Sequence, residues 1–590
     1  MGWQAWFTLA VVFFMVVVLV RDVVSPAAAV VGTMVVLFVA GIITPAQAFS
    51  GFSNPAPITV AALYVLARAV EKTGGLQPIL AATLGEGVGK RRSLSRLLAP
   101  TAAASAFLNN TPIVAMLAPQ VTEWAERRGI SPSRFLMPLS FAAILGGVVT
   151  VIGTSTNLVV SGLLEEYGRE PIGMFEITRV GLPLAVVGVL FLVVASPFLL
   201  RERRGPRRAL EEGFREFLVG MEVAAGGTLD GVAVEAGGLR HLKGVFLVEI
   251  ERTGEIIAPV TPTTILRGGD RLTFVGRADI IPDLQATRGL VSAEEPHIEG
   301  FDSARHTFFE AVIGPASPLV GKTLKEAGFR GKYQAAVVAI HRAGSRVRAK
   351  FGEVRLRVGD TLLLLTDPGF RDRWRDRSDF LLVSRLGGTP PGVSRKAWLV
   401  GLITLAIVLV AGSGFLPILQ AALIGAIALV VLGVLTGGEA RAAIDLEVIL
   451  VIAAAFGIGA AIEASGLAEA LATGLVDALA WLGPTGVLLG VLIATVALTE
   501  LITNNAAAVL MFPIALSTAD QLALDPRPFA IAIAIAASAS FLTPIGYQTN
   551  TMVYGPGGYR FGDYARLGLP LTVLVVVVTV AVVPLFWPFN

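Results

Sequence analysis

Leu108-Asn109-Asn110-Thr111-Pro112 and Thr503-Asn504-Asn505-Ala506 are the two stretches that decide the fold of this chain. A shift of 395 positions superposes the asparagine pairs, together with the valine and the methionine that follow each pair. Both stretches lie inside apolar sequence. Because an asparagine amide needs hydrogen-bond partners that hydrocarbon lacks, burying it there is costly. Two matched pairs therefore indicate that one polar break has been duplicated.

A second matching element follows each stretch. Ile152-Gly153-Thr154-Ser155-Thr156-Asn157 superposes on Ile545-Gly546-Tyr547-Gln548-Thr549-Asn550 with a shift of 393 positions. Gly153 and Gly546 each lie where we expect a helix to break and the backbone to approach an ion. Duplicated polar, broken segments at membrane depth are typical of secondary transporters, which bind substrate between two repeats. The sequence therefore predicts a protein of that kind.

The composition is that of a membrane protein. Hydrophobic residues make up 54% of the chain and charged residues 15%, and the mean hydropathy is +0.72, outside the usual soluble range. The absence of cysteine excludes disulfides, zinc–thiolate sites and thiol catalysis. All four histidines lie between residues 241 and 341, outside the apolar parts. The apolar parts have no paired carboxylates either, so we expect no enzyme, no bound cofactor and no nucleic-acid partner.

Composition divides the chain into two apolar blocks and a charged insert. We expect a first membrane repeat at 1–204, two small domains at 205–295 and 296–392, and a second membrane repeat at 393–590. Each block has five segments near the length that a helix needs to cross a bilayer. These predicted spans are 3–20, 27–44, 57–72, 134–160 and 179–200, then 397–412, 416–436, 446–465, 527–553 and 567–587.

One further segment in each block, 93–123 and 487–522, contains the doubled asparagine. We expect each to be a re-entrant helical hairpin, with Pro112 breaking the first helix. The predicted fold class is a polytopic α-helical membrane protein with two repeats, each of about five transmembrane helices and one hairpin. An odd number of spans inverts the second repeat, so the two hairpin tips meet near the midplane. Between the repeats lies a central α/β insert of two tandem domains.

Positive charge predicts the orientation in the lipid bilayer. Under this topology most loop lysines and arginines fall on one side, which is cytoplasmic by the positive-inside tendency. The other side has little beyond Arg169, Arg179 and Arg527. We therefore expect a multi-pass protein of the cell (inner) membrane, with a cytoplasmic insert and both termini outside.

The hairpin tips and the stretch Thr543–Asn550 resemble the divalent anion/sodium symporters, which carry dicarboxylates, citrate or sulfate. The resemblance covers nearly all of both blocks. That family has Ser-Asn-Thr at each tip, which contacts substrate and helps to bind sodium. Here Asn109-Asn110-Thr111 and Asn504-Asn505-Ala506 take those positions, so Asn replaces Ser twice and Ala506 removes a hydroxyl. The resemblance therefore implies an inorganic divalent anion such as sulfate in preference to a dicarboxylate, an elevator movement and a homodimer.

Broken helices suit both an anion and a cation. Backbone N–H groups and positive dipole ends point into the gap, and asparagine amides and the Thr111 hydroxyl add neutral donors. Unwound carbonyls suit sodium, and no transition metal is expected. No Arg or Lys lies deep in either block, so co-bound cations are the natural counter-charge. The candidate substrate-binding residues are Asn109, Asn110, Thr111, Asn504, Asn505, Thr156 and Thr549, and the candidate sodium-binding residues are Ser105, Asn110, Gly153, Glu500, Asn505 and Gly546.

Glu500 breaks the repeat symmetry, because its equivalent under the shift of 395 positions is Ser105. An ionisable side chain inside an apolar hairpin limb is a functional candidate. Glu500 could ligate sodium, carry a coupling proton or hydrogen-bond a neighbouring helix. A sodium-coupled anion symporter is the first expectation, and a cation/proton antiporter that uses Glu500 is the second. A gated channel ranks third because no filter motif is found, and a membrane-embedded enzyme ranks last.

The charged insert is itself a tandem repeat. A shift of 90 positions superposes Leu266–Leu272 on Leu356–Leu362. Each copy alternates strand patterns with turn signals, and a Gly-Asp turn precedes a strand at 271–275 or 361–365. The copies resemble the TrkA C-terminal (RCK_C) ligand-binding module, without the glycine-rich fingerprint of its nucleotide-binding partner. The resemblance implies a regulatory pair that binds a small effector, pairs internally or assists dimerisation.

Overall fold

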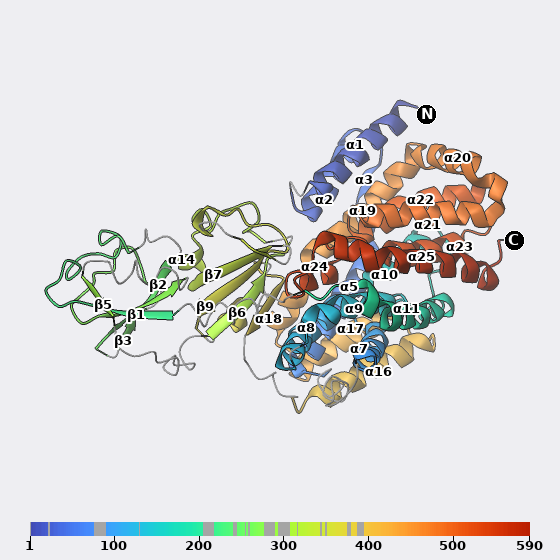
Figure 1. Cartoon of the computed structure of the whole chain (residues 1–590). Helices are drawn as coiled ribbons and strands as arrows, with labels where there is room; N and C mark the ends of the chain where they lie inside the picture. The colour runs from blue at the N-terminus through green and yellow to red at the C-terminus, as the bar shows by residue number, and fades with distance from the viewer. Residues whose placement is uncertain are drawn as a thin grey trace. The chain divides into compact units, whose positions relative to one another are not determined.

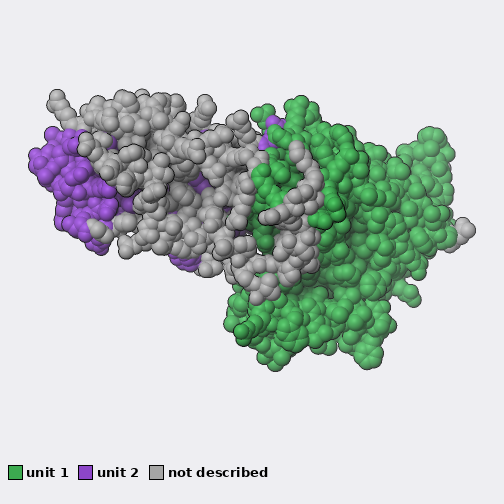
Figure 2. All heavy atoms as spheres, turned by 60° about the horizontal axis from the view of Figure 1, so that its bottom comes forward, with its two compact units in different colours: residues 1–202, 389–590 green, residues 203–388 purple. Residues whose placement is uncertain are grey.

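The computed structural model describes residues 2–21, 24–75, 90–128, 130–203, 218–239, 245–253, 255–257, 260–276, 289–292, 307–314, 317–342, 345–347, 351–367, 369–374, 379–385 and 394–589. The chain forms two compact units, one of residues 1–202 with 389–590 and one of residues 203–388 (Figure 2). The domain boundaries predicted after residues 204, 295 and 392 fall outside the described residues.

All the regular elements among the described residues of the first unit are helices. Its first block contains α1 (Trp3–Val20), α2 (Pro26–Val39), α3 (Pro45–Ala48), α4 (Ser50–Ser53), α5 (Pro55–Thr73), α7 (Lys90–Ser105), α8 (Asn110–Arg127), α9 (Leu136–Gly147), α10 (Ser155–Glu166) and α11 (Thr178–Leu199). Its second block contains α16 (Ala397–Gly412), α17 (Ile418–Val431), α18 (Gly437–Ala443), α19 (Leu446–Ala464), α20 (Leu467–Leu479), α21 (Gly483–Thr499), α22 (Asn504–Gln521), α23 (Arg527–Ser538), α24 (Gln548–Tyr554) and α25 (Phe561–Phe586).

Local sequence explains where several of these helices begin. Ser25, Asn54 and Thr503 precede α2, α5 and α22, and each side chain accepts a hydrogen bond from a backbone N–H of the first turn. Among the described helices, α1, α11, α19 and α25 are long and apolar enough to cross a membrane. The exposed faces of α16 and α17 are lined with leucine, isoleucine and valine, as is expected of surfaces that face hydrocarbon.

Helices α9 and α23 form the centre of the first unit. Every residue of α9 is buried, and α23 is buried from Pro528 to Ser538. A helix that is apolar on all sides is stable where other helices or lipid surround it. Helices α7, α8 and α11 pack against α9, and α21, α22 and α25 pack against α23. Each block therefore contributes one central helix, directly after its hairpin.

The two blocks interleave. Helix α2 packs against α19, and α5 packs against α16 and α17, so the early helices of each block contact those of the other (Figure 1). We call α1, α2, α5, α16, α17 and α19 the scaffold group. The hairpins α7–α8 and α21–α22, with α9–α11 and α23–α25, are the hairpin group. Contacts of α10 with α5 and of α22 with α19 join the two groups.

The bases of the two hairpins contact different loops. Near the base of α7–α8, Tyr559 Oη donates to the carbonyl of Ser133 at 2.5 Å. At the base of α21–α22, Asp520 lies 3.9 Å from Arg169. Away from the hairpins, one ion pair joins α5 to α18 of the second block. Lys72 pairs there with Glu439 at 2.7 Å.

The structure corrects several expectations about the helices. The helix breaks expected at Gly153 and Gly546 are present, as unwound stretches at 148–154 and 539–547, so the predicted spans 134–160 and 527–553 each form two helices instead of one. The prediction that Pro112 breaks a helix is wrong, because α8 already begins at Asn110. Proline is tolerated in a first helical turn, where its missing N–H would have no intrahelical partner. The spans also omitted α20, which packs against α22.

The second unit contains two five-stranded antiparallel sheets of equivalent topology. The first has the order β3-β2-β4-β1-β5 and the second β10-β6-β9-β7-β8. The first sheet consists of β1 (Leu218–Val223), β2 (Val245–Arg252), β3 (Glu255–Ile257), β4 (Arg271–Gly276) and β5 (Leu290–Ser292). The second consists of β6 (Thr307–Val312), β7 (Ala335–Arg342), β8 (Ser345–Arg346), β9 (Thr361–Thr366) and β10 (Leu382–Arg385), with the helices α14 (Phe329–Tyr333) and α15 (Phe370–Trp374).

One buried ion pair is repeated in both sheets. Arg252 Nε donates to Asp270 Oδ1 at 2.8 Å and Nη2 to Oδ2 at 2.7 Å. Arg342 makes both bonds to Asp360 at 2.7 Å. A bidentate pair of this kind is the strong form of the interaction. Because each aspartate directly precedes β4 or β9, the pair fixes the turn that starts the central strand.

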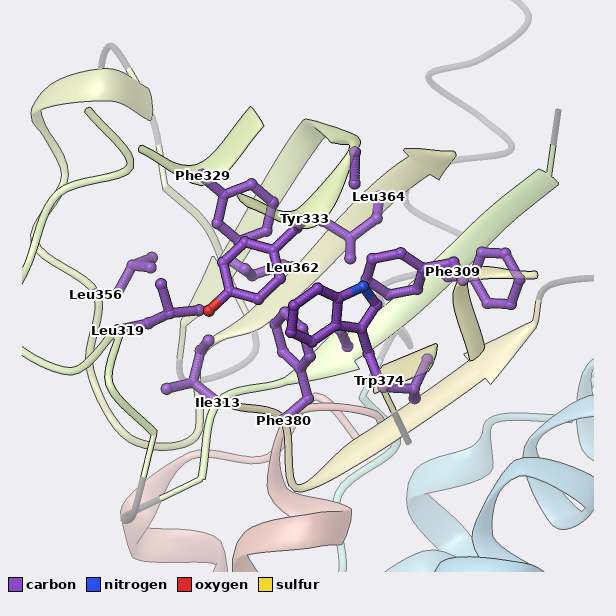
Figure 3. Packing of buried hydrophobic residues seen from close by; sticks show 14 of the residues in the cluster. Phe309, Ile313, Leu319, Phe329, Tyr333, Leu356, Leu362, Leu364, Trp374 and Phe380 are labelled. Carbon is purple, nitrogen blue, oxygen red and sulfur yellow. The ribbon is translucent and has the colours of Figure 1, made fainter. Parts of the chain in front are cut away.

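The second sheet has a large aromatic core. Phe309, Phe329, Tyr333, Trp374 and Phe380 are buried together, as Figure 3 shows. Tyr333 and Trp374 pack with ring centroids 4.6 Å apart. The first sheet has a smaller core in which Phe274 is the aromatic member among the described residues. The two copies therefore share a topology and an ion pair but differ in packing.

Candidate functional site

The tip of the first hairpin places Asn110 in the protein interior. Residues 106–109 connect α7 to α8, and Asn110 is the first residue of α8. Its side chain is fully buried, and its Oδ1 accepts a hydrogen bond from Ser105 Oγ at 2.6 Å. Gly147 lies against the same amide, so that a Cβ there would come within 2.5 Å of Asn110 Oδ1. A hydroxyl and a bare stretch of backbone therefore fix the position of the amide.

The same tip reaches the unwound stretch of the second block. Asn110 Nδ2 donates to Tyr547 Oη at 2.7 Å, and Thr111 Oγ1 donates to Gln548 Oε1 at 3.2 Å. Asn109 is half-buried, and helix α8, which begins at this tip, packs against α5. The first hairpin thus contacts both the second block and the scaffold group.

The second tip makes the reciprocal contact. Asn505 Oδ1 accepts hydrogen bonds from Ser155 Oγ at 3.1 Å and from Thr156 Oγ1 at 3.4 Å. Asn504 Nδ2 donates to Thr156 Oγ1 at 2.9 Å. Ser155 and Thr156 begin α10, directly after the unwound stretch 148–154. Each hairpin tip therefore bonds to the broken helix of the other block.

A buried asparagine closes each unwound stretch. Asn157 Nδ2 donates to the carbonyls of Thr150 at 2.9 Å and of Gly147 at 3.4 Å. Asn550 repeats the arrangement. Its Nδ2 donates to the carbonyl of Thr543 at 3.3 Å and to that of Ser540 at 2.9 Å, and these two residues lie 393 positions after Thr150 and Gly147. Carbonyls at the end of an interrupted helix need partners outside it. Internal duplication therefore extends from the sequence to individual hydrogen bonds.

Glu500 directly follows α21, and its carboxylate hydrogen-bonds the unwound stretch of its own block. Its Oε1 accepts from the backbone N–H of Phe541 at 2.7 Å and of Leu542 at 2.8 Å, and its Oε2 accepts from that of Thr543 at 3.0 Å. The side chain is buried. Of the roles considered from the sequence, the structure shows that Glu500 bonds neighbouring backbone.

Oxygen atoms gather beside Glu500. A Cβ on Gly546 would lie 2.2 Å from Ser540 Oγ and 3.1 Å from both Glu500 Oε2 and Thr543 Oγ1. Only glycine allows the backbone to approach these oxygens so closely. One carboxylate and two hydroxyls are ligands that suit a hard cation. In the first block, a Cβ on Gly153 would lie 2.9 Å from the carbonyl of Ser105.

The candidate residues divide between the two tips. Ser105, Asn109, Asn110, Thr111 and Gly153 gather at the first tip, and Thr156, Glu500, Asn504, Asn505 and Gly546 gather at the second. Thr549 is buried, and its hydroxyl accepts a hydrogen bond from Ser140 of the central helix α9 at 2.8 Å.

Sequence reasoning missed Thr154, Ser540, Thr543 and Tyr547. The shift of 393 positions already relates Thr154 to Tyr547, so applying it residue by residue would have found the last of these. Near the end of α5, Arg68 is buried and pairs with Glu71 at 2.9 Å.

A cavity of about 760 Å³ lies elsewhere in the first unit. Its lining includes Arg169, Arg179 and Arg527, which the sequence assigned to one side, and also Glu176. Arg527 pairs with Glu176 at 2.5 Å, so much of the charge there is compensated. None of the hairpin-tip residues lines this cavity.

Comparison with known proteins agrees with a transport site. Two segments, residues 11–535 and 507–589, match the family described as citrate transporter. The chain belongs to the citrate transporter family. With its apolar helices, it is a multi-pass helical membrane protein of a transporter family.

Relatives of this transporter cover most of its length. A Chlamydomonas reinhardtii protein, provisionally named a sulfur deprivation response regulator, is 36% identical over 552 residues, which are 92% of this chain and 94% of that protein. An uncharacterized transporter of Synechocystis sp. is 36% identical over 554 residues, 91% and 90% of the two chains. Sodium/sulfate cotransporter 2 of Chlamydomonas reinhardtii is 26% identical over 789 positions, 98% of this chain and 89% of that protein. These names support a transporter of the anion family.

Proposed function

We propose that this chain is a sodium-coupled symporter of sulfate or a similar small divalent anion. The observation that carries the proposal is the crosswise bonding of the tips, from Asn110 to Tyr547 and from Ser155 and Thr156 to Asn505. Interrupted helices from both blocks meet there. Their N–H groups, with amide and hydroxyl donors, supply neutral hydrogen bonds to an oxyanion.

The choice of sulfate rests on two observations. Ala506 of the second tip is buried and offers no hydroxyl to a carboxylate. A relative that aligns with 98% of the chain is named a sodium/sulfate cotransporter. The family description refers to citrate, but the tip chemistry favours an anion with one charged head. The anion contacts Asn109, Asn110, Thr111, Asn504, Asn505 and Thr156, and Thr549 belongs to the wall of the site.

Sodium binds beside each tip in this proposal. The first site consists of Ser105, Asn110 and Gly153. The second consists of Glu500, Asn505 and Gly546, with the hydroxyls of Ser540 and Thr543 next to them. Two cations beside a divalent anion reduce the electrostatic cost of carrying it through a region of low dielectric constant. A single carboxylate, at Glu500, makes the second site the more strongly cation-binding of the two.

The repeats are inverted, and transport occurs by an elevator movement of the hairpin group against the scaffold group. The separate contacts of the two hairpin bases support the inversion. Each group contains helices of both blocks, so either could move as one body. The central unit faces the cytoplasm of a cell with an inner membrane, both termini lie outside, and the scaffold groups of two chains form a homodimer.

The central unit regulates transport by binding a small effector, in the manner of RCK_C modules. The duplicated topology of its sheets supports two related modules. Deleting residues 207–388 should leave sulfate uptake that no longer responds to conditions that control the full chain. Intact uptake under unchanged control would remove this role.

The decisive experiment measures radiolabelled sulfate uptake into proteoliposomes, with and without an inward sodium gradient and with succinate as competitor. The purified full chain should accumulate sulfate only with the gradient, and succinate should not compete. Asn505→Ala should abolish uptake because it removes the acceptor for Ser155 and Thr156. Thr473→Ala, which removes an exposed hydroxyl that bonds Gln521, is the matched control and should transport normally.

The other outcomes assign other functions. Competition by succinate would assign a dicarboxylate transporter. Absence of uptake of either anion, with sodium-driven proton movement, would favour a cation/proton antiporter with Glu500 as the proton carrier. Sulfate uptake that ignores both sodium and proton gradients would contradict coupled symport.

A further inference from the structure

Tyr547 and Thr154 occupy equivalent positions in the two unwound stretches. Tyr547 directly precedes α24 and Thr154 directly precedes α10, and 393 positions separate them. Their backbones agree closely, with φ −141° and ψ 135° at Tyr547 and φ −141° and ψ 147° at Thr154. The backbone is therefore duplicated, and the side chain is not. One copy carries its hydroxyl on Cβ, and the other carries it at the far end of an aromatic ring.

The ring brings the Tyr547 hydroxyl into contact with the first tip and with the unwound stretch of the first block. Tyr547 Oη accepts from Asn110 Nδ2 at 2.7 Å and lies 3.3 Å from Thr154 Oγ1. Tyr547 is 7% exposed. One side chain thus touches the hairpin tip of the other block and its own equivalent there.

This asymmetry limits what the site can hold. A site with Thr154 on one side and a second threonine on the other would present two similar sets of donors, separated by open space. Such a site would suit a dicarboxylate, which has a charged group at each end. Tyr547 instead adds a ring where Thr154 has only a methyl and a hydroxyl, and its own hydroxyl lies beside Asn110 and Thr154. A compact tetrahedral oxyanion needs only one central set of donors.

We propose that Tyr547 determines anion size, because its ring excludes two-headed dicarboxylates and its hydroxyl binds the single-headed oxyanion. This inference rests on the proposed function and deepens it, since it assigns the choice between two classes of substrate to one residue. The ring and the hydroxyl have separable roles. Removing the hydroxyl weakens sulfate binding, and removing the ring admits dicarboxylates.

The test compares Tyr547→Thr and Tyr547→Phe in the full chain by sodium-driven sulfate uptake with succinate as competitor. Tyr547→Thr places at this position the side chain that Thr154 has in the first block. Succinate should then inhibit uptake at concentrations at least about tenfold lower than for wild type, which is within the range of discrimination that a difference in side-chain size provides. Tyr547→Phe keeps the ring. It should raise the half-saturating sulfate concentration about tenfold or more, as expected for the loss of one hydrogen bond to a charged group, while succinate stays excluded.

Tyr554 of the same helix provides the matched controls. Tyr554→Thr and Tyr554→Phe make the same chemical changes at a ring that packs against Tyr564, and they should leave the preference for sulfate over succinate unchanged. If Tyr547→Thr does not fold, Tyr547→Phe still decides. Competition by succinate in that variant, or an unchanged half-saturating sulfate concentration, would overturn the inference.

The wild-type measurement separates two kinds of failure. If wild type does not transport sulfate, the proposed function fails and this inference fails with it. If wild type transports sulfate and Tyr547→Thr still excludes succinate, the inference alone is overturned.

Discussion

Replacing Glu500 by glutamine tests whether this side chain holds the unwound stretch of the second block. The carboxylate accepts three backbone N–H bonds, at 2.7, 2.8 and 3.0 Å, from Phe541, Leu542 and Thr543. Glutamine has the same shape but only one acceptor oxygen. If that oxygen keeps the two bonds of Oε1, the amide NH₂ replaces Oε2 and faces the N–H of Thr543. Two donors then oppose each other in a buried place.

The expected magnitude follows from those bonds. A hydrogen bond to a charged group contributes about 1.5–3 kcal/mol, and leaving a buried donor unsatisfied costs about 1–3 kcal/mol. Glu500→Gln should therefore destabilise, by about 3 kcal/mol, the form in which residues 539–547 keep these bonds to residue 500. This corresponds to about a hundredfold increase in the population of the opened form, in which the bonds are broken.

Hydrogen exchange measured by mass spectrometry reports this opening directly. Amides in 539–547 should exchange about a hundredfold faster in Glu500→Gln than in wild type. In proteoliposomes the variant should change the sodium dependence of uptake more than the preference for sulfate over succinate. Glu463→Gln, the same change at an exposed position of α19, is the matched control and should alter neither. Unchanged exchange in 539–547 together with unchanged sodium dependence would refute the argument.

Three further changes test other parts of the structure. Gly147→Ala should abolish uptake, because the new Cβ would lie 2.5 Å from the buried Oδ1 of Asn110 at the first tip. Overpacking of this kind costs about 1–3 kcal/mol. Normal uptake by this variant would show that the tip tolerates displacement. Arg342→Ala should destabilise the second sheet by about 3 kcal/mol, since it leaves Asp360 buried without its bidentate partner. Urea unfolding followed by tryptophan fluorescence measures this, and a curve identical to that of wild type would contradict it. Lys72 lowers the pKa of Glu439 from 4.5 to about 2. The pair therefore stabilises the fold fully above about pH 4.5 and loses its effect as the pH falls toward 2. The difference in thermal stability between wild type and Glu439→Gln should shrink over that window, and a difference independent of pH would exclude the pair as its cause.

The sequence predicted the helices of the membrane unit because their signals are local. The long apolar runs other than 134–160 and 527–553 each became one helix near its expected bounds, since a backbone in an apolar environment must satisfy its own hydrogen bonds. The doubled asparagines predicted the two hairpins for the same reason. The error at Pro112 was also local, because proline is equally compatible with a helix break and with a first helical turn, and only the position of Asn110 in α8 separates these alternatives.

Contacts across the chain needed the tertiary structure. Nothing within 108–112 or 545–550 shows that Asn110 bonds to Tyr547, because those residues lie 437 positions apart and each block could have paired its tip with its own broken helix. The role of Glu500 depended in the same way on where the N–H groups of 541–543 lie. The sequence by itself determined which segments break and that the breaks are duplicated, because helix interruption depends on neighbouring residues. The interleaving of the two blocks decided which polar groups meet, because a buried amide takes its partner from whichever chain segment packs against it.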